Sequence, residues 1–251
     1  MHSREEKLEA FGRLLDVIDR LRVDCPWDRK QTFESLRTQT IEEVYELCSA
    51  ILDERYAEIC KEAGDVLMHM VFYGKLGSEL TADKAFDIAD ICNHEADKLI
   101  FRHPHVYGDV KADTQEQVLQ NWEDLKLREK DGNKTVLGGV PDALPALVKA
   151  MRIQDKARSA GFDWDEPAQV WDKVKEEISE FEAELKQGNQ DNMEREFGDI
   201  IFSIINAARL YNINPENALE QTNRKFIRRF NYLEAKAKEQ GHNLKEMTLE
   251  Q

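Results

Sequence analysis

Carboxylate side chains recur in one spaced pattern in the two halves of this chain. Each copy has a Glu-Glu-x-x-Glu motif, and a Glu-x-Gly-Asp motif begins 16 residues after the last glutamate of the first motif. The first copy consists of Glu42, Glu43, Glu46, Glu62 and Asp65, and the second of Glu176, Glu177, Glu180, Glu196 and Asp199. Carboxylate oxygens are the ligands that Mg²⁺ and Mn²⁺ prefer. The pattern therefore predicts a duplicated helical unit whose acids converge on a divalent cation, with waters left for substrate phosphates.

The simplest alternative is that these acids form solvated helix faces, which is usual in a chain that is 34% charged. The helix with the first motif fits this alternative, because its glutamates lie opposite its apolar side. The helix that follows does not, since apolar residues surround it and leave only a narrow polar stripe. The stripes consist of Glu62, Asp65 and His69 in the first copy and of Glu196, Asp199, Ser203 and Asn206 in the second. Such helices are predicted to be buried, and buried carboxylates with no base on their stripe favour a metal site.

The overall composition excludes several classes of function. The 251 residues carry 50 acidic and 35 basic side chains, and a formal net charge of −15 argues against broad nucleic-acid binding and against attraction to anionic membranes. The four cysteines form no Cys-x-x-Cys pair, so neither a zinc site nor a disulfide framework is indicated. The N-terminus has no apolar signal region, and no later run is long enough to span a membrane. We therefore expect a soluble, cytoplasmic protein.

Helical periodicity without long apolar/polar alternation predicts an all-α fold of two tandem four-helix units. Ser3-x-x-Glu6 has the form of a capping box for the first helix, Gly161 is placed to end a later one, and Asn214 is placed to cap the last. The helices after the first are predicted at about 32–53, 56–76, 82–103, 143–160, 168–187, 191–211 and 215–240.

The chain is predicted to divide into an N-terminal unit at 1–107, a connector at 108–140 and a C-terminal unit at 141–251. The connector contains loop signals such as Asp131-Gly132-Asn133 and one short helix that Thr114-x-x-Gln117 is placed to cap. Both units share an order of elements: a helix, a Trp-Asp loop, an acidic helix, a Gly-Asp helix and a closing helix that carries Lys and Arg.

These features resemble the MazG family of all-α nucleoside triphosphate pyrophosphohydrolases, in its tandem bacterial form and over nearly the whole chain. Besides the acidic motifs, the resemblance rests on Cys25-Pro26-Trp27-Asp28, His103-Pro104-His105-Val106-Tyr107-Gly108, Leu144-Pro145-Ala146-Leu147, Gly161-Phe162-Asp163-Trp164 and Lys225-Phe226-x-Arg228-Arg229-Phe230. The resemblance implies Mg²⁺-dependent hydrolysis of a nucleoside triphosphate to the monophosphate and pyrophosphate. It also implies a homodimer whose packing completes the helices.

The resemblance assigns the metal ligands to the second and third glutamates of the first motif and to both acids of the second. These ligands are Glu177, Glu180, Glu196 and Asp199 in the C-terminal unit, with Glu43, Glu46, Glu62 and Asp65 as a second possible site. Glu176 and Glu42 are then left to orient the ligands or to activate water.

The residues around the two acidic sets differ, and this difference predicts that the C-terminal unit is catalytic and the N-terminal unit degenerate. Asn206 follows Asp199, whereas Phe72 follows Asp65 at the same distance, and the second closing helix has more bases to bind phosphates. The predicted catalytic residues are Glu176, Glu177, Glu180, Lys225 and Arg228, and the predicted substrate-binding residues are Asn206, Asn223, Lys225, Arg228, Arg229 and Trp164.

Several alternatives stay open at this point. The bases of the last helix could belong to a solvated terminal helix, and Trp164 could fill core instead of stacking on a base. His103 and His105 could bind metal, although Pro104 between them favours a turn. A different class of function also fits the pattern, namely a non-enzymatic regulatory module that binds nucleotides or a partner protein through the first copy.

Overall fold

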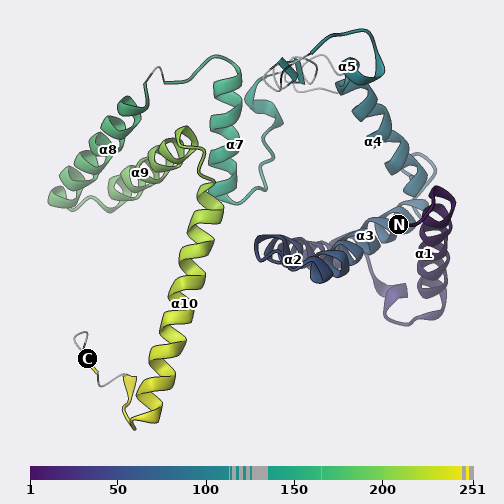
Figure 1. The fold of residues 1–251 in the computed structure, drawn as a ribbon, viewed down its shortest axis with the longest axis horizontal. Coiled ribbons are helices and arrows are strands. Elements are labelled where there is room, and N and C mark those ends of the chain that lie inside the picture. The colour runs from purple at the N-terminus through teal and green to yellow at the C-terminus, as the bar shows by residue number, and fades with distance from the viewer. Residues whose placement is uncertain are drawn as a thin grey trace. The chain divides into compact units, whose positions relative to one another are not determined.

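Helices form all the regular secondary structure in the described part of the chain, which confirms the predicted all-α class (Figure 1). This computed structural model describes residues 1–112, 114, 117–118, 121–122, 125, 135–164, 166–244 and 247–248. The chain divides into two compact units, Met1–Ala112 and Asp113–Gln251, which we call unit 1 and unit 2. The division falls inside the predicted connector.

Unit 1 begins with a helix whose cap was readable from the sequence. The Glu6 backbone N–H donates to Ser3 Oγ at 3.1 Å and the Ser3 N–H donates to the Glu6 carboxylate at 2.6 Å, which satisfies two N–H groups at the helix start. The elements of unit 1 are α1 (Arg4–Asp24), η1 (Asp28–Lys30), α2 (Phe33–Leu52), α3 (Tyr56–Ser78), α4 (Ile88–Arg102) and α5 (Pro104–Tyr107).

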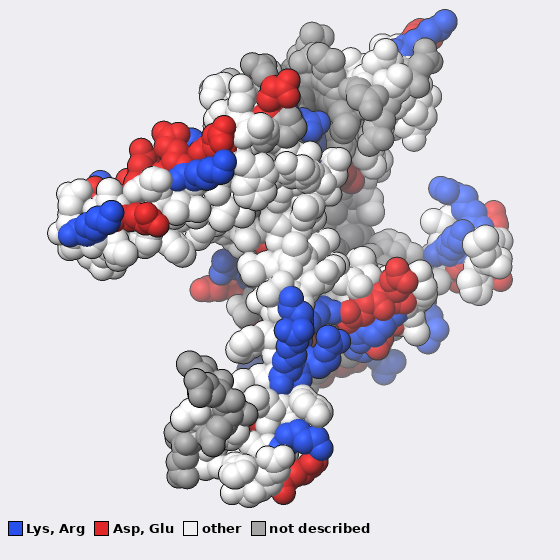
Figure 2. All heavy atoms as spheres, turned by 60° about the vertical axis from the view of Figure 1, so that its left-hand side comes forward, with Lys and Arg blue, Asp and Glu red and all other residues white. Residues whose placement is uncertain are grey.

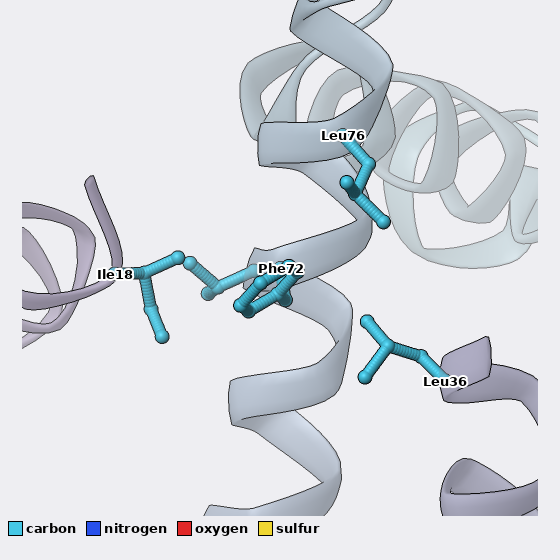
Figure 3. Close-up of a cluster of buried hydrophobic side chains, with 5 residues drawn as sticks. Ile18, Leu36, Phe72 and Leu76 are labelled. Atoms are coloured by element: carbon cyan, nitrogen blue, oxygen red, sulfur yellow. The ribbon is translucent and has the colours of Figure 1, made fainter. Parts of the chain in front are cut away.

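The core of unit 1 forms around Phe72 of α3, whose side chain is 1% exposed. Ile18 of α1 and Leu36 of α2 point toward it from two sides, and Leu76 lies one turn further along α3 (Figure 3). Burying four such apolar side chains is worth several kcal/mol of transfer free energy. This cluster therefore fixes α1 and α2 against α3.

The predicted helix at 82–103 starts six residues too early, because α4 begins only at Ile88. Asp87 is its N-cap, and its carboxylate accepts the backbone N–H groups of Ala89 and Asp90. On either side of the cap the chain runs close against α3, with Phe86 beside Gly77 and Ile88 beside Gly74, where a Cβ atom would clash. That close approach replaces the predicted first turns of the helix.

Unit 2 repeats the helical order of unit 1, but the loop between its two acidic helices is shorter than the loop between α2 and α3. Gly188 has a left-handed φ of +71° and ends one helix, and Asn189 then caps the next by accepting the Asn192 N–H. Gly161 and Asn214 also end and open helices as predicted. The elements of unit 2 are η2 (Leu137–Gly139), α7 (Ala146–Ser159), α8 (Pro167–Gln187), α9 (Gln190–Leu210) and α10 (Pro215–Glu239).

The prediction that α3 and α9 are buried on all sides is wrong for the single chain. On α9, Phe197 is 53% exposed, and Ile201 and Ile204 are exposed as well. On α3, Leu67 is 42% exposed. The apolar pattern of α3 and α9 shows only that their faces favour burial. Within one chain, each of the two helices has too few neighbours to cover all of its apolar side chains.

Part of the connector bears on the predictions made above. The Gln117 backbone N–H donates to Thr114 Oγ1 at 3.3 Å, as expected for a helix cap. The body of the predicted short helix and the Asp131-Gly132-Asn133 loop lie outside the described residues, as does Asp165 of the second Trp-Asp loop. Among the helices that the structure describes, none is both long enough and apolar enough to cross a membrane.

Candidate active site

Three of the four predicted metal ligands come together in each unit. In unit 2, α8 supplies Glu177 and α9 supplies Glu196 and Asp199, and ligand oxygens of the three lie within 4.8 Å of one another. Figure 2 shows acidic side chains gathered on the helical arm that α8 and α9 form. Glu180 lies one turn further along α8, outside this group, and Glu176 is exposed. The α8–α9 hairpin thus brings together acids that are far apart in the motif pattern.

Unit 1 places the equivalent acids in the same way. Glu43 of α2 lies with Glu62 and Asp65 of α3, again within 4.8 Å, and Glu46 is outside the group. Glu62 is buried, and its Oε2 has no hydrogen-bond partner. A buried carboxylate oxygen without a donor is costly, so the residues present fit a hard divalent cation.

Mutual repulsion of the acids is visible in their pKa values. Burial, followed by the charges of Asp65 and Glu46, raises the pKa of Glu43 above its ordinary value. Partial removal from water, followed by the charges of Glu177 and Glu196, raises the pKa of Glu180. Glu180 is therefore close enough to sense the cluster although it lies outside it. A bound cation would counter the part of both shifts that comes from the neighbouring carboxylates.

Lys173 of α8 is a site residue that the sequence analysis missed. Its Nζ lies 2.8 Å from the carboxylate of Glu177, which is buried, and 3.1 Å from the carboxylate of Glu176, which is exposed. These hydrogen bonds raise the pKa of Lys173. The polar stripes of the Glu-x-Gly-Asp helices carry no base, but on the preceding helix the spacing of four residues between Lys173 and Glu177 is itself the signal. Unit 1 has Gln39 at the equivalent position.

A cavity of about 550 Å³ opens beside the acids of unit 2. Glu177 and Asp199 line it together with apolar, aromatic and other polar side chains. Its other lining residues are Leu137, Ile153, Gln154, Ala157, Phe162, Asp163, Trp164, Val170, Lys173, Phe202, Ser203, Asn206 and Arg209. This volume is within the range of small-molecule sites, and the wall combines carboxylate and aromatic side chains.

The predicted substrate-binding residues fall into two groups. Asn206 and Trp164 line the cavity, so Trp164 is not a core residue. The four predicted on the last helix do not line it; they are exposed on α10, which leaves the other helices of unit 2 at its N-terminal end (Figure 1). They are Asn223, Lys225, Arg228 and Arg229. In the single chain, the cations at the cavity are instead Lys173 and Arg209.

The position equivalent to Asn206 in unit 1 belongs to a packed core. Phe72 is fully buried there. One turn back on α3, His69 is also buried, and its Nδ1 lies 2.8 Å from Thr40 Oγ1, which in turn lies 2.7 Å from the Tyr73 hydroxyl. His69 is thus part of a hydrogen-bonded network. Phe72 and His69 are thus buried in unit 1 at the positions equivalent to Asn206 and Ser203 of the unit 2 cavity.

The two histidines around Pro104 form a structured corner. His103 Nδ1 lies 2.6 Å from the Leu99 carbonyl oxygen, and α5 begins at Pro104. Neither histidine belongs to a group of possible metal ligands in the described residues. The geometry favours the turn over the metal site.

Comparison with known proteins agrees with this architecture. The family model described as the MazG nucleotide pyrophosphohydrolase domain matches residues 31–107 and 166–233. The chain is 41% identical, over 96% of its length and 91% of the relative, to a Thermotoga maritima protein named nucleoside triphosphate pyrophosphohydrolase/pyrophosphatase MazG. It is 39% identical, over 90% of its length and 88% of the relative, to an Escherichia coli K12 protein named nucleoside triphosphate pyrophosphohydrolase.

A third relative has a longer chain. The Bacillus subtilis protein named YabN is 44% identical over 98% of this chain, but the match covers 51% of that protein. Scaffold and matches together define the class of α-helical nucleotide pyrophosphohydrolases. The chain belongs to the MazG family, which confirms the predicted family and the prediction of an enzyme.

The Lys173 ion pair generates a first prediction. In metal-free buffer, Lys173→Gln leaves the buried Glu177 carboxylate without its base, and we expect a loss of about 1–3 kcal/mol in the free energy of unfolding. Lys175→Gln on the same helix breaks only an exposed pair with Asp172, and a change below about 0.5 kcal/mol is expected. Denaturant titration monitored by circular dichroism measures both.

Magnesium provides the control for this prediction. Because a divalent cation supplies the positive charge that Lys173→Gln removes, added Mg²⁺ should reduce the difference between this variant and the wild type. Equal losses in Lys173→Gln and Lys175→Gln would contradict the assignment.

Proposed function

We propose that this protein hydrolyses nucleoside triphosphates, including deoxynucleotides, to nucleoside monophosphate and pyrophosphate, with Mg²⁺ or Mn²⁺ as cofactor and unit 2 as the catalytic unit. The observation that carries the proposal is the carboxylate cluster of Glu177, Glu196 and Asp199, of which Glu177 and Asp199 line a cavity that also has aromatic side chains in its wall. Family membership and the printed names of the relatives support the reaction class.

The proposed metal ligands are Glu177, Glu180, Glu196 and Asp199. Their oxygens are hard ligands, and the pKa of Glu180 is raised by partial removal from water and then by the charges of Glu177 and Glu196. When bound, a divalent cation would neutralise phosphate charge and lower the pKa of a coordinated water. Glu176, which is exposed and paired with Lys173, is placed on the same helix to orient these groups or to accept a proton from water.

We propose that different parts of the cavity bind the phosphates and the nucleoside of the substrate. Phosphates belong beside the acids, where Lys173 supplies a cation. The base and the sugar belong in the apolar part, where Phe162 and Trp164 offer aromatic faces and Asn206 offers a polar group. Stacking of a base on an aromatic ring is tolerant of the base's identity, so we propose a site that accepts several bases.

Unit 1 supports the attribution to unit 2 by contrast. Its acids have the same arrangement, so Glu43, Glu46, Glu62 and Asp65 remain a proposed second metal site. Phe72, however, is packed in the core at the position where Asn206 lines the cavity. We propose that unit 1 contributes structure or regulation. The packing of Phe72 thus favours a regulatory module for unit 1 alone.

The homodimer belongs to the same proposal. On α10, Phe226 is 67% exposed, and Ile227 and Phe230 are about half exposed. Exposed apolar rows of this kind mark interaction surfaces. If a second copy of the chain covers α10, the bases of α10, Lys225 and Arg228 among them, lie next to the surface of that second copy. We propose that these bases reach the phosphates only across the subunit interface.

A nucleotide panel tests the reaction. Incubation with Mg²⁺ and each ribo- and deoxynucleoside triphosphate should yield monophosphate and pyrophosphate, resolved by anion-exchange chromatography. Chelation of the metal should abolish turnover, and Mg²⁺ should restore it. Diphosphate and phosphate as products would identify a different phosphohydrolase, and no turnover on any nucleotide would favour the regulatory module.

A matched pair of variants tests the division between the units. Glu177→Gln removes a proposed ligand of unit 2 and should lower pyrophosphate release about 100-fold or more. Glu43→Gln is the equivalent change in unit 1 and should leave the rate close to that of the wild type. If Glu43→Gln abolishes activity while Glu177→Gln does not, the catalytic unit has been assigned to the wrong half.

Complementation tests the proposed contribution across the interface. Glu177→Gln and Arg228→Ala should each be inactive as pure homodimers. After subunit exchange, half of the dimers contain one variant of each kind and have one intact site, so about a quarter of the wild-type activity should return. Light scattering establishes the dimer independently. No recovery in exchanged dimers would place Arg228 at its own chain's site or outside both.

A further inference from the structure

Arg209 of α9 contacts two separate parts of the cavity wall. Its guanidinium forms a two-pronged ion pair with Asp163, in which Nη1 donates to Oδ2 at 3.1 Å and Nη2 donates to Oδ1. Nε and Nη2 also donate to Asn206 Oδ1, at 3.1 and 2.9 Å. The Arg209 side chain is 13% exposed, so these charge-assisted bonds are largely shielded from water.

The ion pair with Asp163 holds the aromatic part of the wall. Asp163 stands between Phe162 and Trp164, and all three line the cavity. The Asp163 carboxylate also accepts the Trp164 backbone N–H at 2.9 Å. One carboxylate thus ties the backbone at Trp164 to α9, although the two aromatic side chains themselves are substantially exposed. Without Arg209, the loop loses its charged attachment to the helix that carries Asp199.

The second contact orients Asn206. Because Oδ1 accepts two N–H groups from Arg209, the amide cannot be reversed without placing its NH₂ against the guanidinium. Nδ2 is therefore the group left to donate to a ligand. Asp199, Ser203 and Asn206 follow at helical spacing on α9 and all line the cavity. The donor of Asn206 and the carboxylate of Asp199 consequently face the same space.

Unit 1 has no equivalent of this arrangement. Lys75 occupies the position of Arg209 in the repeat and pairs with the exposed Asp19 of α1 at 2.8 Å. A lysine ammonium has no planar fork and cannot form the two-pronged pair that Arg209 forms with Asp163. The arginine fork therefore accompanies the cavity and is not a general requirement of the helical scaffold.

We propose that Arg209 is a positioning residue for nucleotide binding, which holds the Phe162–Trp164 loop and the Asn206 amide in one fixed relation to the acidic cluster. This inference rests on the proposed function of the unit 2 cavity. The loop and the amide contact the nucleoside part of the substrate, while the acids and Lys173 contact the phosphate part. Loss of Arg209 therefore weakens nucleotide binding more than it slows the chemical step.

Steady-state kinetics with ATP and Mg²⁺ provide the test. Arg209→Gln should raise KM about tenfold or more and change kcat much less, because both wall elements lose their common attachment. Arg209→Lys keeps the charge beside Asp163 but loses the fork, so its KM should fall between those of the wild type and Arg209→Gln. Lys75→Gln is the matched control in unit 1 and should leave KM unchanged.

A double-mutant cycle separates positioning from general stability. If Arg209 acts on binding by orienting Asn206, then Asn206→Ala should have little further effect on KM in the Arg209→Gln background. Additive effects, a fall in kcat at constant KM, or a lowered melting temperature with KM unchanged would each overturn the proposal. Should Arg209→Gln fail to fold, Arg209→Lys and Asp163→Asn give the same comparison.

Failure of the inference is distinguishable from failure of the proposed function. Full activity in Glu177→Gln would remove the reaction from this cavity, whatever Arg209 does. Normal kinetics in a folded Arg209→Gln protein, with Glu177→Gln inactive, would overturn only the role of Arg209.

Discussion

The repulsion among three carboxylates held within 4.8 Å is the constraint on which unit 2 depends. Such a cluster forms only where packing elsewhere compensates for its cost. The α8–α9 hairpin supplies that packing through Val170, Val174 and Ala207, which are almost fully buried between the helices. Lys173 offsets part of the charge at Glu177. The remaining deficit of positive charge is what suits the cluster to the proposed cation.

Duplication preserved this constraint and changed what lies beside it. Both units hold their acids on paired helices, yet one position on the second helix is Phe72 in unit 1 and Asn206 in unit 2. The phenylalanine joins a core. The asparagine instead lines a cavity and is held by Arg209. The exchange of Phe72 for Asn206 thus accompanies the difference between a packed core in unit 1 and a cavity in unit 2, while the helical scaffold is retained.

Local sequence signals predicted the fold well where they act within a few residues. Caps at Ser3 and Asn214 fixed helix starts, because each is a contact between near neighbours. The start of α4 was missed since it depends on the close approach of the chain around its cap to Gly74 and Gly77 of α3. For the site, the motifs identified the carboxylates. Lys173 was readable from its spacing, but Arg209 was not, because its partners Asp163 and Asn206 meet only in the folded unit.

The apolar pattern of α9 and α10 predicts burial that one chain does not provide. Phe197 on α9 and Phe226 on α10 are both more than half exposed, although a helix with so many apolar residues is stable in water only when its faces are covered. The same helices carry the acids and the bases that phosphate chemistry needs. Association of two chains would resolve both problems at once, since it covers the apolar faces and brings bases toward carboxylates. In the proposed dimer, the quaternary structure would therefore be part of the site's chemistry.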